Sequence, residues 1–151
     1  MKKLLIVYHT QGVRTTELAE AALAGARTIE ETETTLKRAF DTSADDLLAA
    51  DAILFGTPEN FGYMSGAMKD LFDRTFYTCE NKVDGKPYAV FVCAGNDGTG
   101  AVINIDRICS GLKLKKVCEP VIARKVNTPA LVEQARELGA TLAAGIAFGV
   151  F

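Results

Sequence analysis

The segment from Gly56 to Gly66 carries side chains suited to binding a flat, polar molecule. It contains a proline, a carboxylate, an amide, two aromatic rings and three glycines. It follows the apolar run Ala52 to Phe55, which is typical of a buried parallel strand, and it precedes a helical pattern. Ligands of open α/β sheets bind at the carboxyl ends of the strands. The sequence therefore predicts a binding site in this segment.

A second polar segment follows the first apolar run of the chain. After Tyr8 the sequence passes through Thr10, Gly12 and Thr15 into a helical pattern. Backbone N–H groups at a helix N-terminus, together with hydroxyl groups, can bind a phosphate. The simpler interpretation is that Thr15 or Thr16 only caps the helix. The position of the segment in the predicted fold favours the phosphate site.

A third segment, Ala94 to Gly100, is rich in glycine. Asn96, Asp97 and Gly98 form a sequence that is common in ordinary turns. Glycines after a central strand also let the backbone approach a planar ligand closely and offer it N–H groups. With the other two segments, this one completes a predicted cradle.

Residues suited to acid–base, nucleophilic or metal chemistry are few. The chain has one histidine, His9, and four cysteines without a C-x-x-C pair, which is a poor set of zinc ligands. There is no G-x-S-x-G motif, and Cys93 lacks the arginine six residues later that a low-molecular-weight phosphatase needs. We therefore expect no catalytic side chain and no metal, reduced thiols in the core, and His9 at a strand end near the ligand.

Apolar runs alternate along the chain with helical patterns. Pro129 suits the first turn of the last helix, with Asn127 or Thr128 as its cap. The predicted strands cover residues 3–8, 34–40, 53–57, 88–94 and 115–122, and the predicted helices cover 15–26, 43–50, 65–76, 99–112 and 129–147.

This alternation predicts an α/β fold, a single three-layer, doubly wound domain over residues 1–151. We expect a five-stranded parallel sheet in the order 2-1-3-4-5, an order inferred from the length of the chain. Strands one, three and four are then central. The segments 9–15, 57–64 and 94–99 leave their carboxyl ends, so all three face one site.

Composition excludes several classes of partner. With 17 basic and 19 acidic residues the net charge is -2, which gives no electrostatic basis for binding nucleic acid. No apolar stretch approaches the roughly 18 residues of a membrane span, and the first run is interpreted as a strand, not as an export signal. We expect a cytoplasmic protein that binds neither membrane nor nucleic acid.

The chain resembles the flavodoxin-like family of FMN proteins, particularly its NAD(P)H-dependent FMN and quinone reductase branch. Gly56 to Lys69 matches that branch's long signature G-T-P-x-x-F/Y-G-x-M-S/P-x-x-M/L-K. The family motif S/T-x-T-G-x-T after strand one has its outer positions at Thr10 and Thr15. The glycine here is Gly12, and Val13 stands where the family has glycine. The resemblance covers essentially the whole chain.

The resemblance implies FMN as the cofactor and assigns three groups of residues to it. FMN carries the electrons itself, so no catalytic side chain is implied, and Phe61 or Tyr63 is the candidate for stacking on the flavin. The implied cofactor-binding residues are Thr10, Gln11, Gly12, Val13, Arg14 and Thr15 at the phosphate, Pro58, Glu59, Asn60, Phe61, Gly62 and Tyr63 at the ring and ribityl chain, and Ala94, Gly95, Asn96 and Gly98 at the pyrimidine end.

The implied function is that of an oxidoreductase in which NADPH or NADH reduces FMN, and FMN passes electrons to a quinone, a free flavin or another small acceptor. The alternative is a flavodoxin-type electron carrier that works with a redox partner protein. Such carriers are usually strongly acidic, and a net charge of -2 gives little steering. A third interpretation, a binding module that has lost its cofactor, rests on the altered first loop.

The reductase branch forms dimers or tetramers that share active sites, so the resemblance also implies a homo-oligomer. The apolar end of the chain, Ala147 to Phe151, could pack across such an interface. It could equally finish the last helix against its own sheet. The sequence leaves both arrangements open.

Overall fold

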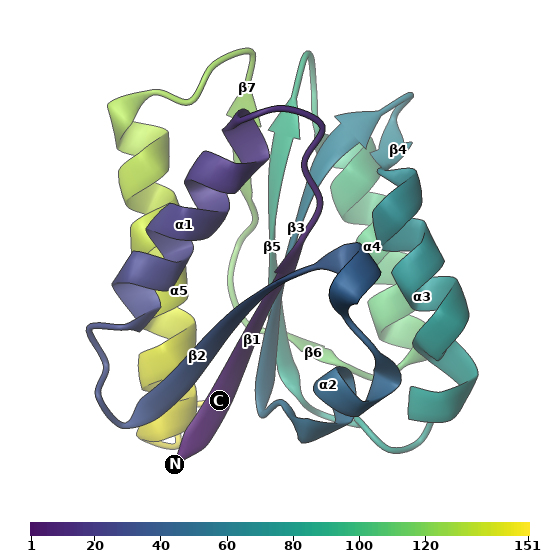
Figure 1. Ribbon diagram of the computed structural model, residues 1–151, viewed down its shortest axis with the longest axis vertical. Coiled ribbons are helices and arrows are strands. Elements are labelled where there is room, and N and C mark those ends of the chain that lie inside the picture. The colour runs from purple at the N-terminus through teal and green to yellow at the C-terminus, as the bar shows by residue number, and fades with distance from the viewer.

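The computed structural model describes residues 1–151, and its strands form one sheet with helices on both faces (Figure 1). The main path of the sheet has the order β2-β1-β3-β5-β6, and β7 pairs with β5 while β4 pairs with β3. All pairs are parallel except β3 with β4. The strands are β1 (Lys2–Tyr8), β2 (Thr32–Arg38), β3 (Ala52–Asn60), β4 (Tyr63–Met64), β5 (Pro87–Ala94), β6 (Lys115–Lys116) and β7 (Val121–Arg124).

The predicted class and the order of the first four predicted strands are confirmed, but the predicted five-stranded, all-parallel sheet is wrong. The expected fifth strand, 115–122, is two strands, β6 and β7, and each pairs with a different part of β5. Pro120 lies between them and has no N–H group for a strand ladder. β3 also continues past Gly56, where its pairing with β1 ends, and after Asn60 the chain turns back as β4 and pairs antiparallel with it.

Two helices cover one face of the sheet and three cover the other (Figure 1). The first pair is α1 (Arg14–Ala26) and α5 (Pro129–Ala147). The other face carries α2 (Ala44–Ala49), α3 (Gly66–Cys79) and α4 (Thr99–Gly111), and a short 3-10 turn, η1 (Ala39–Asp41), follows β2. Each helix lies within a few residues of its predicted range.

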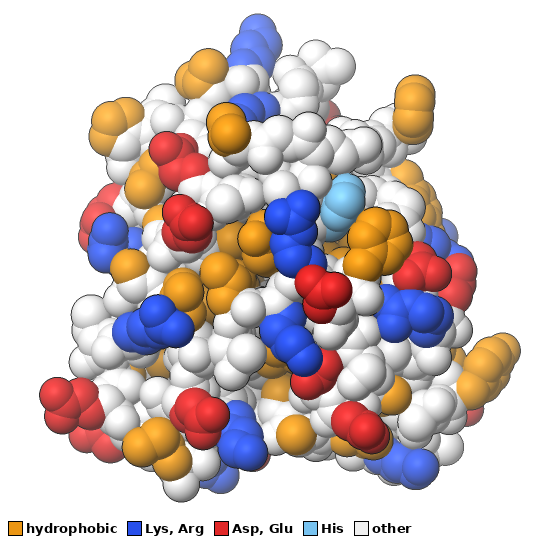
Figure 2. Space-filling model, viewed as in Figure 1, with side chains coloured by type: hydrophobic (Ala, Val, Ile, Leu, Met, Phe, Trp, Pro, Cys, Tyr) orange, Lys and Arg blue, Asp and Glu red, His pale blue; other side chains and the backbone are white.

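Charged side chains of both signs are intermingled on the surface in the view of Figure 2. No basic stripe is visible on this face, which agrees with the small net charge. None of the helices is both long and apolar enough to cross a membrane. No group of His, Cys, Asp and Glu side chains is arranged to hold a metal ion.

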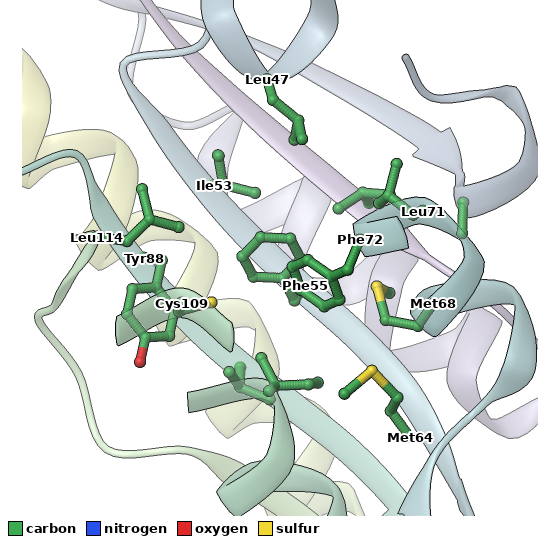
Figure 3. Close-up of a cluster of buried hydrophobic side chains, with 14 of the residues drawn as sticks. Leu47, Ile53, Phe55, Met64, Met68, Leu71, Phe72, Tyr88, Cys109 and Leu114 are labelled. Atoms are coloured by element: carbon green, nitrogen blue, oxygen red, sulfur yellow. The ribbon is translucent and has the colours of Figure 1, made fainter. Parts of the chain in front are cut away.

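Burial on both faces explains why the strands are apolar throughout. All eight residues of β5 are buried. Successive residues of β3 face opposite sides, so Leu54 packs with α1 and α5 while Phe55 packs toward α3. The ring centroids of Phe55 and Phe72 lie 5.2 Å apart in the hydrophobic core between the sheet and α2, α3 and α4 (Figure 3). Each such side chain contributes roughly 1.5–3 kcal/mol.

The apolar end of the chain, Ala147 to Phe151, packs only partly against its own sheet. Phe151 packs against Gly145 and the core between α5 and the sheet. Phe148 and Val150 are exposed. The segment therefore finishes α5 and also leaves apolar surface at the edge of the sheet opposite the candidate site.

Candidate functional site

The loops that follow β1, β3 and β5 meet at one edge of the sheet, and we call them the first, second and third loop in that order. A cavity of about 160 Å³ is lined by the segment Thr10 to Thr15, by Pro58 and by Cys93. These residues leave the carboxyl ends of three neighbouring strands. The structure therefore brings the predicted segment Thr10 to Thr15 together with Pro58 of β3 and Cys93 of β5.

The N-terminus of α1 opens beside this cavity without a capping side chain. Its N-cap residue is Val13, whose exposed side chain cannot accept a hydrogen bond. The backbone N–H groups of Val13, Arg14, Thr15 and Thr16 make no hydrogen bond within the chain, and the first one in the helix comes from Glu17. Thr15 and Thr16 lie inside α1, so the simple capping interpretation is wrong.

Every other helix has an internal partner for its N-terminus. Free N–H groups at a helix start carry partial positive charge and attract anions. α1 is therefore the one α-helix whose N-terminal N–H groups have no partner within the chain. The partners at the other helices are Asp46 for α2, Ser65 for α3, Glu59 for α4 and Thr128 for α5.

The hydroxyl of Thr10 shapes the loop ahead of α1. Thr10 Oγ1 donates to the carbonyl oxygen of Gly12 at 2.8 Å and lies 3.4 Å from the Gly12 nitrogen, which donates to it. Gln11, Gly12 and Val13 are exposed, whereas Thr15 is buried. The loop is thus closed on itself with its backbone N–H groups accessible.

Arg14 lines the cavity, but its guanidinium group is occupied by other parts of the chain. Nη1 donates to the carbonyl oxygen of Ala94 at 3.3 Å, and Nη2 donates to that of Ala123 at 2.8 Å. Nε donates to Asn127 Oδ1 at 3.3 Å, and the Asn127 amide donates back to the Arg14 carbonyl oxygen at 2.9 Å. Arg14 therefore joins the first loop to the ends of β5 and β7.

Glu59 binds the N-terminus of α4. Its carboxylate accepts from the backbone nitrogens of Gly98 at 3.0 Å and Ala101 at 3.1 Å. The negative charge of Glu59 is therefore directed at a helix N-terminus, where it is stabilised. The contact joins the second loop to the third.

Side-chain hydrogen bonds connect each of the three loops to the other two. The amide of Asn60 donates to Gln11 Oε1 at 2.7 Å, which joins the second loop to the first. Glu59 joins the second loop to the third, and Arg14 joins the first to Ala94 at the start of the third. These contacts form within the protein itself, so the loops hold their relative positions before any ligand arrives.

The hairpin between β3 and β4 presents an aromatic ring to solvent. Phe61 and Gly62 both have positive φ angles, 55° and 70°, as a two-residue type I′ turn requires. A phenylalanine in that conformation costs roughly 1–2 kcal/mol. Its side chain is 106% exposed, whereas Tyr63 packs against the core. Of the two predicted stacking residues, Phe61 is the one with a free ring.

The hairpin also rests directly on α4. A Cβ atom at Gly100 would overlap the carbonyl oxygen of Gly62, so the two backbones are in contact. In the third loop, Gly98 has a φ of 83° and is buried, and Ala94 is buried at the end of β5. Gly95 and Asn96 are exposed. Both residues follow the carboxyl end of β5, at the same edge of the sheet as the cavity.

Cys93, which lines the cavity, and His9, which directly follows β1, are both uncharged at neutral pH. Burial raises the pKa of the Cys93 thiol, which stays protonated at neutral pH. Burial and the nearby Arg38 guanidinium lower the pKa of His9, so its imidazole is neutral there. The site offers hydrogen bonds and shape, with no activated nucleophile.

Two residues that hold Arg14 in the candidate site were not predicted from the sequence. Asn127 was considered only as a helix cap, yet Thr128 caps α5 and Asn127 binds Arg14 and Glu17. The carbonyl oxygen of Ala123 anchors Arg14. No local pattern marks either residue, because both act through partners more than a hundred residues away in the sequence.

The fold and the site define an α/β protein of the flavodoxin-like class. The chain belongs to the NADPH-dependent FMN reductase family, whose model matches residues 8–126. The predicted family is confirmed.

Two relatives agree with this membership. A flavodoxin of Aquifex aeolicus is 36% identical over 100 residues, covering 66% of this chain and 54% of the relative. An NAD(P)H dehydrogenase (quinone) of Acidithiobacillus ferrooxidans is 30% identical over 121 residues, covering 66% of this chain and 60% of the relative. The matches thus span between half and two thirds of those proteins.

Solved structures share the fold over nearly the whole chain. An archaeal flavodoxin has a TM-score of 0.82 at 22% identity, covering 95% of this chain and 98% of the other. A WrbA-like flavodoxin of Agrobacterium tumefaciens has a TM-score of 0.79 at 24% identity, covering 99% of both chains. The flavodiiron protein of Giardia intestinalis has a TM-score of 0.84 at 22% identity, covering 99% of this chain and 37% of the other.

Proposed function

We propose that this protein binds FMN at the carboxyl edge of the sheet and acts as an oxidoreductase. Electrons pass from NADPH or NADH through FMN to a quinone, a free flavin or another small acceptor. The observation that carries the proposal is the N-terminus of α1, which alone among the helices lacks a cap and opens beside a cavity. Family membership supplies the identity of the ligand.

The first loop suits the phosphate of FMN. Unpaired N–H groups from Val13 to Thr16 offer several donors to one dianion, and the helix dipole adds to the attraction. The Arg14 guanidinium also lies at the cavity and supplies positive charge while it anchors the loop. The departure of this loop from the family motif therefore leaves a usable phosphate site.

The second and third loops suit the ring and the ribityl chain. FMN supplies the electron-transfer chemistry when it is bound, so the protein has to bind it, orient it and tune its charge. Exposed backbone at Gly95 and Asn96 is available to the polar edge of the ring, and Pro58, Asn60 and Phe61 to its other parts. Both oxygens of the Glu59 carboxylate accept hydrogen bonds at the N-terminus of α4, so its negative charge is directed at that helix and opposes electron uptake by the ring less than a free carboxylate would.

An electron carrier is the second candidate. The similarity to a protein called flavodoxin favours it. A carrier would need a redox partner protein to be reduced, whereas a reductase accepts electrons from NADPH or NADH directly. The reductase and the electron carrier both require FMN binding. The third interpretation from the sequence, a binding module that has lost its cofactor, does not.

Spectroscopy separates these candidates. The purified protein is mixed with FMN, passed through a desalting column, and its absorbance is followed anaerobically after NADPH or NADH is added. Bound flavin that bleaches directly supports the reductase. Bound flavin that stays oxidised until a reductase protein is added identifies a carrier, and a lack of retained flavin contradicts both.

We place the protein in the cytoplasm, as its cysteines suggest. All four are free, and Cys79, Cys93 and Cys109 are buried. Thiols kept reduced in this way are typical of a reducing compartment.

A further inference from the structure

A second group of side chains suited to binding a ligand lies beside the candidate FMN site, at the carboxyl ends of β1 and β2. His9 follows β1, Arg38 is the last residue of β2, and Phe40 lies in the turn η1 immediately after it. Figure 2 shows the single histidine between a basic side chain and a large apolar one on an open face. The FMN proposal uses none of the three.

Phe40 presents a ring that the fold does not bury. It is 65% exposed, and its one aromatic neighbour is His9, with ring centroids 5.8 Å apart and planes at 75°. This contact fixes the two rings relative to each other, and most of the Phe40 side chain stays exposed to solvent. A planar heterocycle could stack there.

Arg38 presents positive charge without an acceptor. Its guanidinium lies 5.7 Å from the centre of the Tyr8 ring, near the outer limit of a cation–π contact. It forms no ion pair and no side-chain hydrogen bond, although Asp41 lies in the same turn. The neutral imidazole of His9 contacts Phe40 and lies close enough to Arg38 to feel its charge, and it can donate or accept a hydrogen bond.

The group lies next to the first loop, because His9 and Thr10 are consecutive and the His9 nitrogen donates to the Gly56 carbonyl oxygen at 3.1 Å. β2 is the edge strand, so no further strand covers Arg38. A molecule that contacts a ligand in the three-loop site can therefore extend along this edge onto Phe40 and Arg38.

We propose that His9, Arg38 and Phe40 bind an adenosine phosphate, the adenosine half of the nicotinamide dinucleotide that reduces the flavin. The adenine stacks on Phe40 and contacts His9, and a phosphate group pairs with Arg38. This assignment rests on the proposed function, because it needs a dinucleotide substrate. A neutral ring such as a quinone would use Phe40 but would leave Arg38 without a role.

The test compares hydride donors that contain the adenosine half, NADPH and NADH, with a donor that lacks it. Steady-state rates of F40A and R38A are measured with NADPH and NADH, and with the reduced nicotinamide mononucleotide. The KM for the dinucleotide rises about tenfold in each variant, the change expected from losing one stacking or charge-assisted contact. The kcat, the FMN affinity and the KM for the mononucleotide stay unchanged.

Two variants of matched chemistry serve as controls. Arg27 is exposed and makes no ion pair or side-chain hydrogen bond, and Phe148 is 62% exposed. Both lie after the ends of helices at the opposite edge of the sheet, so R27A and F148A should behave as the wild type. The proposal is overturned if F40A and R38A match these controls, or if they change the KM for the mononucleotide by as much as that for the dinucleotide.

A binding measurement tests the adenosine-phosphate site separately from the proposed reductase function. The FMN-treated protein is titrated with 2′,5′-ADP and with 5′-AMP in a calorimeter. Binding that is lost in R38A supports the site even if the protein oxidises no nicotinamide, in which case only the reductase proposal fails. A larger effect on 2′,5′-ADP places Arg38 at a 2′-phosphate, and an equal effect places it at the 5′-phosphate. No binding of either nucleotide overturns the site.

Discussion

The carboxylate of Glu59 lies at the N-terminus of α4, with Oε2 3.1 Å from the backbone nitrogen of Ala101. The other oxygen accepts from Gly98 at 3.0 Å. One side chain thus caps a helix and also fixes the distance between two loops of the candidate site. Its removal should affect both stability and ligand binding.

Replacing Glu59 by alanine should lower the free energy of unfolding by about 1–3 kcal/mol, because two backbone N–H groups lose their acceptor. E59Q should lose less, since its amide oxygen can still accept one hydrogen bond. Urea unfolding of the protein without FMN measures both. E31A, which removes an exposed glutamate with no hydrogen bond, is the control, and an E59A protein as stable as E31A would contradict the capping role.

Replacing Arg14 by methionine should weaken FMN binding about tenfold and riboflavin binding much less. Riboflavin lacks the phosphate, so it does not use the loop that Arg14 anchors to Ala94 and Ala123. One charge-assisted contact corresponds to about this change in affinity. Fluorescence quenching of each flavin gives the two dissociation constants, and equal weakening of both would show that Arg14 acts on the ring site instead.

Gly100→Ala should lower the free energy of unfolding by about 1–3 kcal/mol, because the added methyl group would overlap the Gly62 carbonyl oxygen. FMN binding should weaken as well, since the hairpin has to move. Gly66→Ala is the matched control, because Gly66 begins α3 with open space around its Cα. That variant should be neutral or slightly more stable. Thermal unfolding of the two variants side by side gives the comparison.

Phe61→Asn should raise the free energy of unfolding by about 1 kcal/mol, because asparagine tolerates a φ of 55° better and the lost ring contacts nothing in the chain. If the ring covers bound flavin, the same variant should bind FMN more weakly. A stability that falls instead would mean that Phe61 packs against the protein. Urea unfolding and a flavin titration on one sample measure both effects.

The stability of the protein should decrease as the pH falls through the titration of His9. Burial and Arg38 lower the pKa of His9 below its ordinary value of 6.5, so the unfolded chain binds the proton more readily than the folded chain. The free energy of unfolding therefore falls as the pH decreases from about 7 through 6.5 to the folded-state pKa, and this contribution is constant below it.

The pH effect can be assigned to one residue, because the chain has a single histidine. Its imidazole resonances give the folded-state pKa directly by NMR. H9Q should remove the decrease between pH 7 and the folded-state pKa, and R38M should reduce it, because one of the two causes is gone. An imidazole that titrates at 6.5 or above would contradict the prediction.

The sequence by itself determined the class of fold, the ranges of the helices and the family. These depend on local patterns, namely apolar runs of strand length, helical spacing, and the signature from Gly56 to Lys69. It also indicated that three polar segments face one site, because parallel strands present their carboxyl ends at one edge. Each of these inferences needs only neighbours in the sequence or the general geometry of the fold.

The tertiary structure alone decided how the site residues are used. Whether Arg14 faces a phosphate or the carbonyl oxygens of β5 and β7, and whether Glu59 is free or caps α4, depends on residues 39 to 113 positions away. Two further features could also be seen only in the tertiary structure. One is the missing cap on α1, and the other is the proximity of His9, Arg38 and Phe40. Hydrogen bonds and charges act between residues that are close in space. The periodicity of a sequence does not indicate which residues distant along the chain will become such neighbours.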